Sequence, residues 1–338
     1  MPEAETDSSS RTHVPVARQA GAPAVASRLR GADIKRLVPV LLLVVMCLAF
    51  GSLSSRFLQF QNAMIILQQA VVLLVAALGA TFVIVAGSID LSVGSIVALA
   101  ALTAAVTSDS LGVAAVVPSI VVGLAAGLLN GIVIAKGKVP SFIVTMGAMV
   151  VYRGVVLFWT RGAPVSINDE AFLDVYSGRS WGLPHSALIA LVLVALAHVV
   201  LNYTVFGREL RAVGAGERVA VLTGIRVPRV KIAMFGLLGL MCGMAGLLQG
   251  ARTMAATSQL GEGLELDVIA AVVVGGTPLT GGIGTIGGTI LGALIITILS
   301  NGMNMIGVDP YVQNIVKGLV LVGAVFVTID RAKIGIIK

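Results

Sequence analysis

The stretch Ala-Gly-Ser-Ile-Asp-Leu-Ser-Val-Gly-Ser at residues 86–95 places one acid, three serines and two glycines inside a long apolar run. A carboxylate in such surroundings is costly unless it faces protein, water or a helix end, so Asp90 indicates a functional interior surface. Alternatively, Asp90 and Ser92 cap a helix that begins near Leu91, because their side-chain oxygens accept hydrogen bonds from unpaired backbone amides. The two roles are compatible.

The composition around this stretch is that of a membrane protein. Hydrophobic residues make up 57% of the 338 residues and charged residues only 12%, about half the charged fraction of a soluble domain. The apolar runs are continuous and long enough to cross a bilayer as helices, which excludes a β-barrel. The predicted fold class is therefore all-α, a polytopic transmembrane bundle. Cys47 and Cys242 lie in apolar runs and are expected to be buried thiols, with no metal site.

The domain organisation follows from the same pattern. Residues 1–36 are rich in Ser, Ala, Pro and Arg without a hydrophobic period, so they are expected to form a disordered cytoplasmic tail. A cleaved signal peptide is not expected, because no small-x-small cleavage site follows the first apolar run. Residues 37–330 form the predicted membrane domain, and residues 331–338 form a cytoplasmic C-terminus.

Ten helical spans are predicted from the apolar runs. Seven of them are expected at 37–54, 63–86, 89–107, 112–135, 140–160, 185–206 and 231–250. The run at 268–306 is too long for one span, and we divide it at the Gly-Gly-Thr-Pro-Leu-Thr-Gly-Gly segment 275–282. The last span is expected at 311–329.

Charge sets the orientation of these spans. Most of the 23 Lys and Arg residues fall in the tail, the turn at 136–138, the segment 207–231 and the C-terminus. Since basic residues concentrate on the cytoplasmic side, both termini are predicted to be cytoplasmic. The net charge of +7 then reflects orientation and does not require a nucleic-acid partner. Arg153 and Lys317 fall within spans, and each is expected to snorkel to an interface.

The polar break at 87–95 has a counterpart at 275–288, one in each half of the chain. Paired interruptions of this kind are typical of the midplane site of a transporter, and they predict two related halves with broken helices. Irregular backbone at that depth must face protein or a water-filled cavity. The candidate residues of the substrate pathway or gate are Asp90, Ser92, Ser95, Thr277 and Thr280.

Two longer external segments, 161–184 and 251–267, carry acidic residues. Charge complementarity suits them to dock a partner with a basic rim, although solvated loops without a partner would have the same composition. The candidate docking residues are Asp169, Glu170, Asp174, Glu262 and Glu265.

Several kinds of chemistry are missing from the sequence. It contains no phosphate-binding loop, no His-Glu-x-x-His pair and no Gly-x-Ser-x-Gly elbow, so neither an enzyme nor a cofactor is expected. Because intramembrane acids are few, any driving energy is expected to come from a partner. The cytoplasmic segment 207–231 contains a short helical pattern at 217–222, between Gly216 and Gly224, which suits a groove on that partner. The alternative is a basic loop that lies on lipid headgroups.

Four motifs resemble one known family. They are Ser-Ile-Asp-Leu-Ser-Val-Gly-Ser at 88–95, Ile-Ala-Lys-Gly-Lys-Val-Pro at 134–140, Glu-Leu-Asp-Val-Ile-Ala-Ala-Val-Val-Val-Gly-Gly-Thr at 265–277 and Asn-Gly-Met-Asn at 301–304. Together they resemble the permease subunits of bacterial ABC importers for ribose and related sugars, over nearly the full length after the tail. The chain departs from the family at Ser88, where relatives usually carry Gly, and at Arg218 and Val219, where relatives often carry two alanines.

The resemblance implies a set of partners. They are a second permease copy or paralogue, ATP-binding cassette subunits, an extracytoplasmic solute-binding protein and the lipid of the bacterial inner membrane. It also implies that the coupling helix maps onto residues 214–224, with Gly214, Gly216, Glu217, Arg218 and Gly224 as the candidate ATPase-coupling residues.

The predicted function is the membrane-spanning pathway subunit of an ATP-driven importer of a monosaccharide. Aromatic residues amount to only 5%, so selectivity is expected to reside mainly in the binding protein, and Asp90 to fix a helix start and gate geometry more than to grip sugar. The same architecture could import a branched-chain amino acid, a nucleoside or a furanosyl signal molecule. An ATP-independent secondary transporter or channel, or a non-transporting scaffold, are alternatives of another class.

Overall fold

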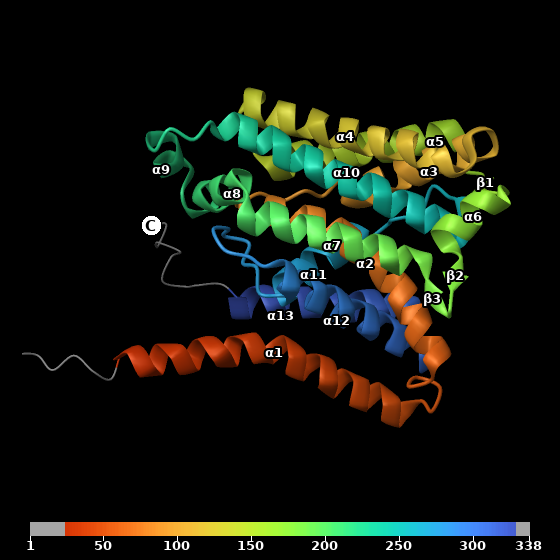
Figure 1. Cartoon of the computed structure of the whole chain (residues 1–338), viewed down its shortest axis with the longest axis horizontal. Helices are drawn as coiled ribbons and strands as arrows, with labels where there is room; N and C mark the ends of the chain where they lie inside the picture. Colours follow the sequence, from red (N-terminus) through yellow and green to blue (C-terminus); the bar gives the residue numbers. More distant parts are fainter. Residues whose placement is uncertain (1–23, 329–338) are drawn as a thin grey trace, which may run out of the picture. The chain divides into compact units, whose positions relative to one another are not determined.

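The computed structural model describes residues 24–328, and their side chains for residues 38–326. The long helices are α1 (Ala24–Leu53), α2 (Phe60–Val85), α3 (Val93–Leu111), α4 (Val116–Gly137), α5 (Ser141–Thr160), α7 (His185–Tyr203), α10 (Val227–Thr253), α12 (Ile286–Met305) and α13 (Pro310–Thr328). Shorter helices are η1 (Gly112–Ala115), α6 (Glu170–Ser177), α8 (Val205–Ala215), α9 (Glu217–Leu222) and α11 (Leu264–Val274) (Figure 1). The described residues thus form a helical fold.

The predicted terminal segments lie mostly beyond this description. Of the predicted tail, residues 1–23 lie outside the described residues, and so does the predicted C-terminus at 331–338. Helix α1 begins at Ala24 and not near residue 37. The chain divides into two compact units, Met1–Val38 and Pro39–Lys338, and every contact reported below lies within the second.

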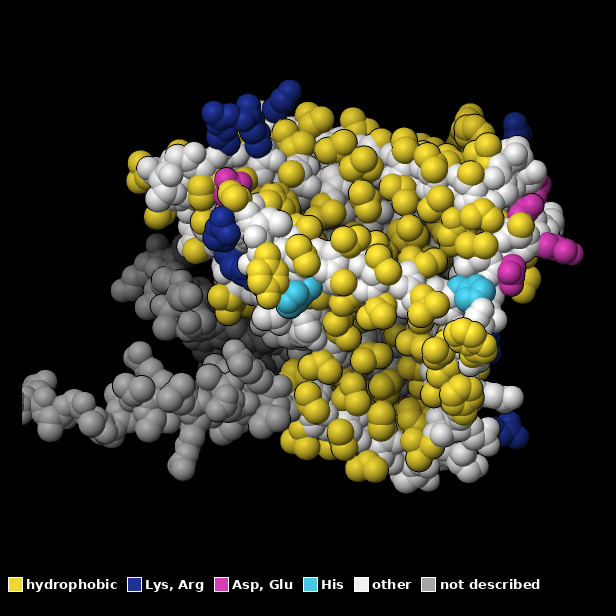
Figure 2. Space-filling model, in the orientation of Figure 1, with side chains coloured by type: hydrophobic (Ala, Val, Ile, Leu, Met, Phe, Trp, Pro, Cys, Tyr) yellow, Lys and Arg dark blue, Asp and Glu magenta, His cyan; other side chains and the backbone are white. Residues whose placement is uncertain are grey.

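Six segments of the described chain are long and apolar enough to cross a membrane. They are Phe60–Val85, Val93–Gly137, Ser141–Thr160, His185–Tyr203, Val227–Thr253 and Ile286–Met305, and Val38–Leu53 and Pro310–Phe326 are shorter apolar helices. Hydrophobic side chains cover the surface between the two ends of the bundle, where the charged groups gather (Figure 2). An exposed apolar belt of this kind is expected where lipid is the solvent. The protein is therefore a polytopic membrane protein.

The helix boundaries agree with the sequence pattern to within a few residues after α1. The division of the apolar run at 268–306 is confirmed, because α11 ends at Val274 and α12 begins at Ile286. The pattern did not separate α8 from the predicted loop 207–231. This helix is amphipathic and buries Gly207, Leu210 and Val213.

Two groups of helices have the same order along the chain and similar contacts. Helix α2, residues 86–92, α3, α4 and α5 follow the same order as α10, residues 254–263, α11, α12 and α13. Helix α4 packs on α10 as α12 packs on α2, and α3 contacts α5 as α11 contacts α13. The predicted pairing of 87–95 with 275–288 is therefore corrected, since the position equivalent to 86–92 is 254–263. That segment is polar, so its sequence is indistinguishable from that of an external loop.

The two ends of the bundle differ. At one end, α6 lies with the short strands β1 (Val165–Ser166), β2 (Arg179–Ser180), β3 (Leu183–Pro184) and β4 (Ala255–Ala256). Strand β1 pairs with β4 and β2 pairs with β3, both antiparallel. The Tyr176 hydroxyl of α6 donates to the carbonyl of Val113 at 2.8 Å, and burial raises the pKa of Tyr176, so the phenol remains a donor. At the other end lie α8 and α9 (Figure 1).

Glycines allow α4 and α10 to approach closely, as the small-xxx-small pattern predicts. A Cβ on Gly127 would meet the carbonyl oxygen of Phe235 and the backbone of Gly239. A Cβ on Gly147 of α5 would meet nothing within 4 Å.

Gly127→Ala is expected to destabilise the protein by about 1–3 kcal/mol, because the two helix backbones must move apart. The matched control is Gly147→Ala, which is expected to leave stability unchanged or to raise it by up to about 1 kcal/mol through helix propensity. Thermal unfolding of the purified full chain in detergent measures both. Equal midpoints for the two variants would contradict the role of Gly127.

Candidate functional site

Residues 86–92 leave the helical path between α2 and α3, and Asp90 organises their end. Asp90 is 4% exposed, and its Oδ1 accepts hydrogen bonds from the Ser92 backbone N–H at 2.7 Å and the Ser92 hydroxyl at 2.6 Å. Helix α3 begins at Val93, directly after these bonds. A carboxylate here satisfies one backbone donor, the N–H of the N-cap residue Ser92, and interacts favourably with the helix dipole, whereas Ser92 makes no side-chain cap bond of its own. Asp90 Oδ2 is buried without a hydrogen-bond partner among the described residues.

Polar side chains of α4 and α5 support this segment. Asn130 donates to the Ser92 hydroxyl at 2.9 Å, and the Tyr152 hydroxyl lies 3.0 Å from Asn130 Oδ1. Two hydroxyls of α5 accept backbone hydrogen bonds from the break, Ser141 from Ile89 and Thr145 from Leu91. The amides that helix geometry leaves unpaired are thereby satisfied inside the bundle, as membrane depth requires.

A second irregular connection, residues 254–263, meets the start of α3. Gly94 and Gly261 approach so closely that a Cβ on either would overlap the other's carbonyl oxygen, and the Glu265 carboxylate lies beside Gly94. Arg153 of α5 donates through Nη1 to the carbonyl of Leu260 at 2.8 Å and to that of Ser258. The expectation that Arg153 snorkels is therefore corrected, because two interior carbonyls hold its guanidinium.

The third irregular segment, residues 275–285, contacts the end of α2 and helix α8. The Gly282 N–H donates to the Val85 carbonyl at 2.8 Å. A Cβ on Gly214 of α8 would collide with Val85 and Gly282, so the three backbones meet. Thr277 is fully buried, and its hydroxyl has no hydrogen-bond partner in the part of the chain that the structure describes, whereas Thr280 is exposed. The end of α2, the end of α8 and the segment 275–285 are joined here by contacts between backbones, which leave no room for a side chain at Gly214.

A cavity of about 240 Å³ lies between α2, α3, α10, α11, α12 and α13. Its polar lining includes Gln69, Gln249, Arg252, Glu262, Asp267 and Lys317. Lys317 Nζ lies 2.9 Å from Asp267 Oδ2, and both side chains are about one-fifth exposed. The expectation that Lys317 snorkels is corrected by this ion pair, which links α13 to α11. Ionisable side chains inside an apolar bundle are typical of functional sites, so the ion pair on the wall of this cavity indicates a functional interior.

The five predicted pathway residues do not line this cavity. Asp90, Ser92 and Ser95 form one buried cluster, in which the Ser95 hydroxyl donates to the Ser92 carbonyl at 2.8 Å. Thr277 and Thr280 lie in the third irregular segment, residues 275–285. The sequence analysis missed Gln69, Gln249 and Arg252 as interior residues. The sequence does contain a signal for them, because Gln69 and Gln249 interrupt apolar runs in which contact with lipid requires only apolar side chains.

The predicted docking residues separate into two groups. Asp169 caps α6, accepting from the Phe172 N–H at 2.7 Å, and Glu170 and Asp174 are exposed on the same helix. Glu265 lies in the first turn of α11 with its carboxylate beside Gly94, and its docking role stays a prediction. Glu262 is exposed and also lines the cavity.

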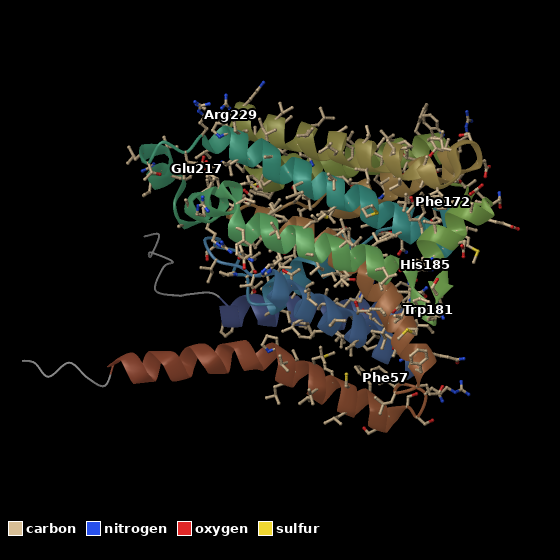
Figure 3. The ribbon with its side chains drawn as sticks, viewed as in Figure 1. Phe57, Phe172, Trp181, His185, Glu217 and Arg229 are labelled. Carbon is tan, nitrogen blue, oxygen red and sulfur yellow. The ribbon has the colours of Figure 1, made fainter. Side chains whose placement is uncertain are left out.

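The predicted coupling residues surround α9. The helical pattern at 217–222 is confirmed as α9, Glu217–Leu222, with Gly216 at its N-cap and Gly224 beyond its end at a φ of 85°. Glu217 pairs with Lys231 at 2.8 Å and Arg218 is exposed. The apolar side chains of α9 project outward, with Leu222 86% and Val219 64% exposed. Figure 3 labels Glu217 and Arg229 at this end.

Known proteins resemble the chain over most of its length. Residues 62–325 match the family model described as branched-chain amino acid transport system / permease component. The ribose import permease protein RbsC of Escherichia coli (strain K12) is 39% identical over 302 residues, which cover 87% of this chain and 92% of that protein.

Two further relatives extend the likeness. RbsC of Bacillus subtilis (strain 168) is 38% identical, covering 88% of this chain and 94% of that protein. The L-arabinose ABC transporter permease protein AraH of Azospirillum brasilense is 34% identical, covering 84% and 85%. No solved structure gives a significant match. The family model matches most of the residues of this chain, so the chain belongs to the family of branched-chain amino acid transport system permease components. The members of this family are transport subunits and not enzymes.

Proposed function

We propose that this protein is the membrane-spanning pathway subunit of an ATP-driven, binding-protein-dependent importer of a monosaccharide. The observation that carries the substrate class is the near full-length likeness to permeases named for ribose and L-arabinose. The irregular connections 86–92 and 254–263, the second of which meets the start of α3 where Gly261 touches Gly94, support a transporter, because broken helices with buried polar groups form the sites of transporters.

The proposed topology has ten spans with both termini in the cytoplasm of a bacterium, across its inner membrane. The spans are α1, α2, α3, α4, α5, α7, α10, α11, α12 and α13. Lys and Arg side chains gather at the end of the bundle that carries α8 and α9, and acidic side chains project at the end that carries α6 (Figure 2). The excess of basic residues makes the α8–α9 end cytoplasmic.

The proposed partner at the cytoplasmic end is the ATP-binding subunit. Helix α9 presents exposed apolar side chains there, and a short amphipathic helix is suited to an apolar groove. Force on α8 and α9 would reach Gly214, whose backbone touches Val85 and Gly282. Val85 ends α2 and Gly282 lies in the irregular segment 275–285, so a displacement of α8 would move the end of α2 and this segment together. This is how ATP-driven closure would rock the helices around the breaks.

The proposed partners at the other end are the solute-binding protein and, within the bilayer, a second permease copy or paralogue. Exposed Glu170 and Asp174 give α6 the charge that a basic rim would match. Phe172, Trp181 and His185 lie at this end (Figure 3). Trp181 is fully exposed at the turn between β2 and β3.

The experiment is reconstitution of the complete complex with its solute-binding protein in proteoliposomes. We expect uptake of a pentose that requires ATP, and ATPase activity that the sugar-loaded binding protein stimulates. The panel includes branched-chain amino acids, because the family description names them. Uptake by the permease alone would establish a secondary transporter instead, and stimulation by amino acids but by no sugar would refute the substrate class.

A further inference from the structure

The cavity between α2, α3, α10, α11, α12 and α13 is lined by two cations and two anions. Its lining includes the cations Arg252 and Lys317 and the anions Glu262 and Asp267. These charges balance, so the lining as a whole selects neither an anion nor a cation. A charged solute in this cavity would be repelled by the side chains of its own sign as well as attracted by the others. A neutral solute with hydrogen-bonding groups would find donors and acceptors throughout the lining.

One of these groups has hydrogen-bonding capacity to spare. Arg252 Nε is buried without a hydrogen-bond partner among the described residues. A buried donor left in this state is costly, and it is usually satisfied by water or by a ligand. Arg252 stands one turn from Gln249 on α10, and Gln69 faces the same cavity from α2. The two amides add both donors and acceptors.

The size and lining also limit what the cavity can hold. Its volume of about 240 Å³ lies below the roughly 300–1,000 Å³ of sites for drug-sized ligands. No aromatic side chain is among its described lining residues, so recognition would be by hydrogen bonds to hydroxyls and not by stacking. A small polyhydroxylated solute fits both conditions.

The cavity is in direct contact with the moving parts of the proposed mechanism. Gly261 and Leu264 line it, and Gly261 touches Gly94 at the first turn of α3. The Asp267–Lys317 ion pair joins α11 to α13 on its wall. Rearrangement of the irregular connection would therefore change the shape of the cavity and the position of its charges together.

We propose that this cavity is a binding site for the transported neutral polyhydroxylated solute, at which the membrane subunit itself contributes to selectivity. Gln69 and Gln249 bind hydroxyls, the Arg252 guanidinium donates to the solute, and the Asp267–Lys317 pair presents an acceptor and a donor side by side. The inference rests on the proposed function and extends it, because the sequence analysis assigns selectivity mainly to the binding protein.

The test compares Gln69→Leu with Gln68→Leu in the reconstituted complex. The two glutamines are neighbours on α2 and are buried to a similar degree, but Gln68 does not line the cavity and bonds to Arg179 at 3.0 Å. Sugar uptake and ATP hydrolysis are measured together. Gln69→Leu is expected to keep ATPase stimulation by the loaded binding protein while uptake per ATP falls at least about tenfold, because a site built to bind hydroxyls loses a partner. Gln68→Leu is expected to keep both.

Arg252→Gln is the second variant, and it keeps the test decisive if Gln69→Leu fails to assemble. It is expected to lower uptake per ATP. It is also expected to reduce the difference in uptake between the preferred sugar and its deoxy analogue. Unchanged uptake and selectivity in both variants would overturn the site, and so would a parallel loss of ATPase and uptake, which indicates a structural role. Absence of ATP-dependent sugar uptake in the wild-type complex would refute the proposed function instead, so the two failures are distinguishable.

Discussion

Leu222→Glu is expected to abolish ATP-dependent uptake. Leu222 is 86% exposed at the end of α9, and Val219 and Val221 beside it are more than half exposed. If this surface docks in an apolar groove of the ATP-binding subunit, a buried carboxylate there has no partner. Loss of a central apolar anchor typically costs about 2 kcal/mol or more, equivalent to about a thirtyfold weaker complex. Co-purification of the ATP-binding subunit and ATPase activity measure this directly.

The matched control is Leu222→Met, which conserves volume and apolar character and is expected to keep assembly and uptake. Because Leu222 lies outside the buried core, Leu222→Glu should leave the thermal unfolding of the isolated chain unchanged. Full co-purification of the ATP-binding subunit with Leu222→Glu would show that α9 is not the docking helix. A basic loop lying on lipid headgroups would then be the better description of this end.

Gly94→Ala is expected to lower uptake at least as strongly as any single change at the predicted pathway residues. The added methyl would overlap the carbonyl oxygen of Gly261 and approach the carboxylate of Glu265. The clash can be relieved only if the start of α3 or the connection before α11 moves. Such overpacking costs about 1–3 kcal/mol, and the displaced segments are those on which alternating access depends. Uptake in proteoliposomes and the thermal unfolding midpoint are the two measurements.

Gly287→Ala provides the comparison for Gly94→Ala. Gly287 is the second residue of α12 as Gly94 is the second residue of α3, and a Cβ on Gly287 would meet nothing within 4 Å. The control is therefore expected to transport normally. If both variants transported at the wild-type rate, the contact between Gly94 and Gly261 would have no part in the transport cycle.

The sequence determined the features that depend on local composition. Continuous apolar runs identified the helices, because the length and polarity of a segment decide whether it can cross a bilayer. The helix at 217–222 was readable from its two bounding glycines, and the division of the run at 268–306 from its polar break. The acid at position 90 marked a buried polar cluster, since a carboxylate among apolar residues needs a partner.

Only the tertiary structure decided which distant segments meet. Residues 254–263 have the composition of an external loop, and their equivalence to residues 86–92 becomes visible only when the helices on either side are found to pack in the same way. Lys317 has a partner, Asp267, that lies 50 positions away in the sequence, and no local pattern encodes that distance. The cavity is likewise assembled from six helices and the connection before α11. Local residues fix helices because their hydrogen bonds are local, whereas a site between helices depends on how their faces pack.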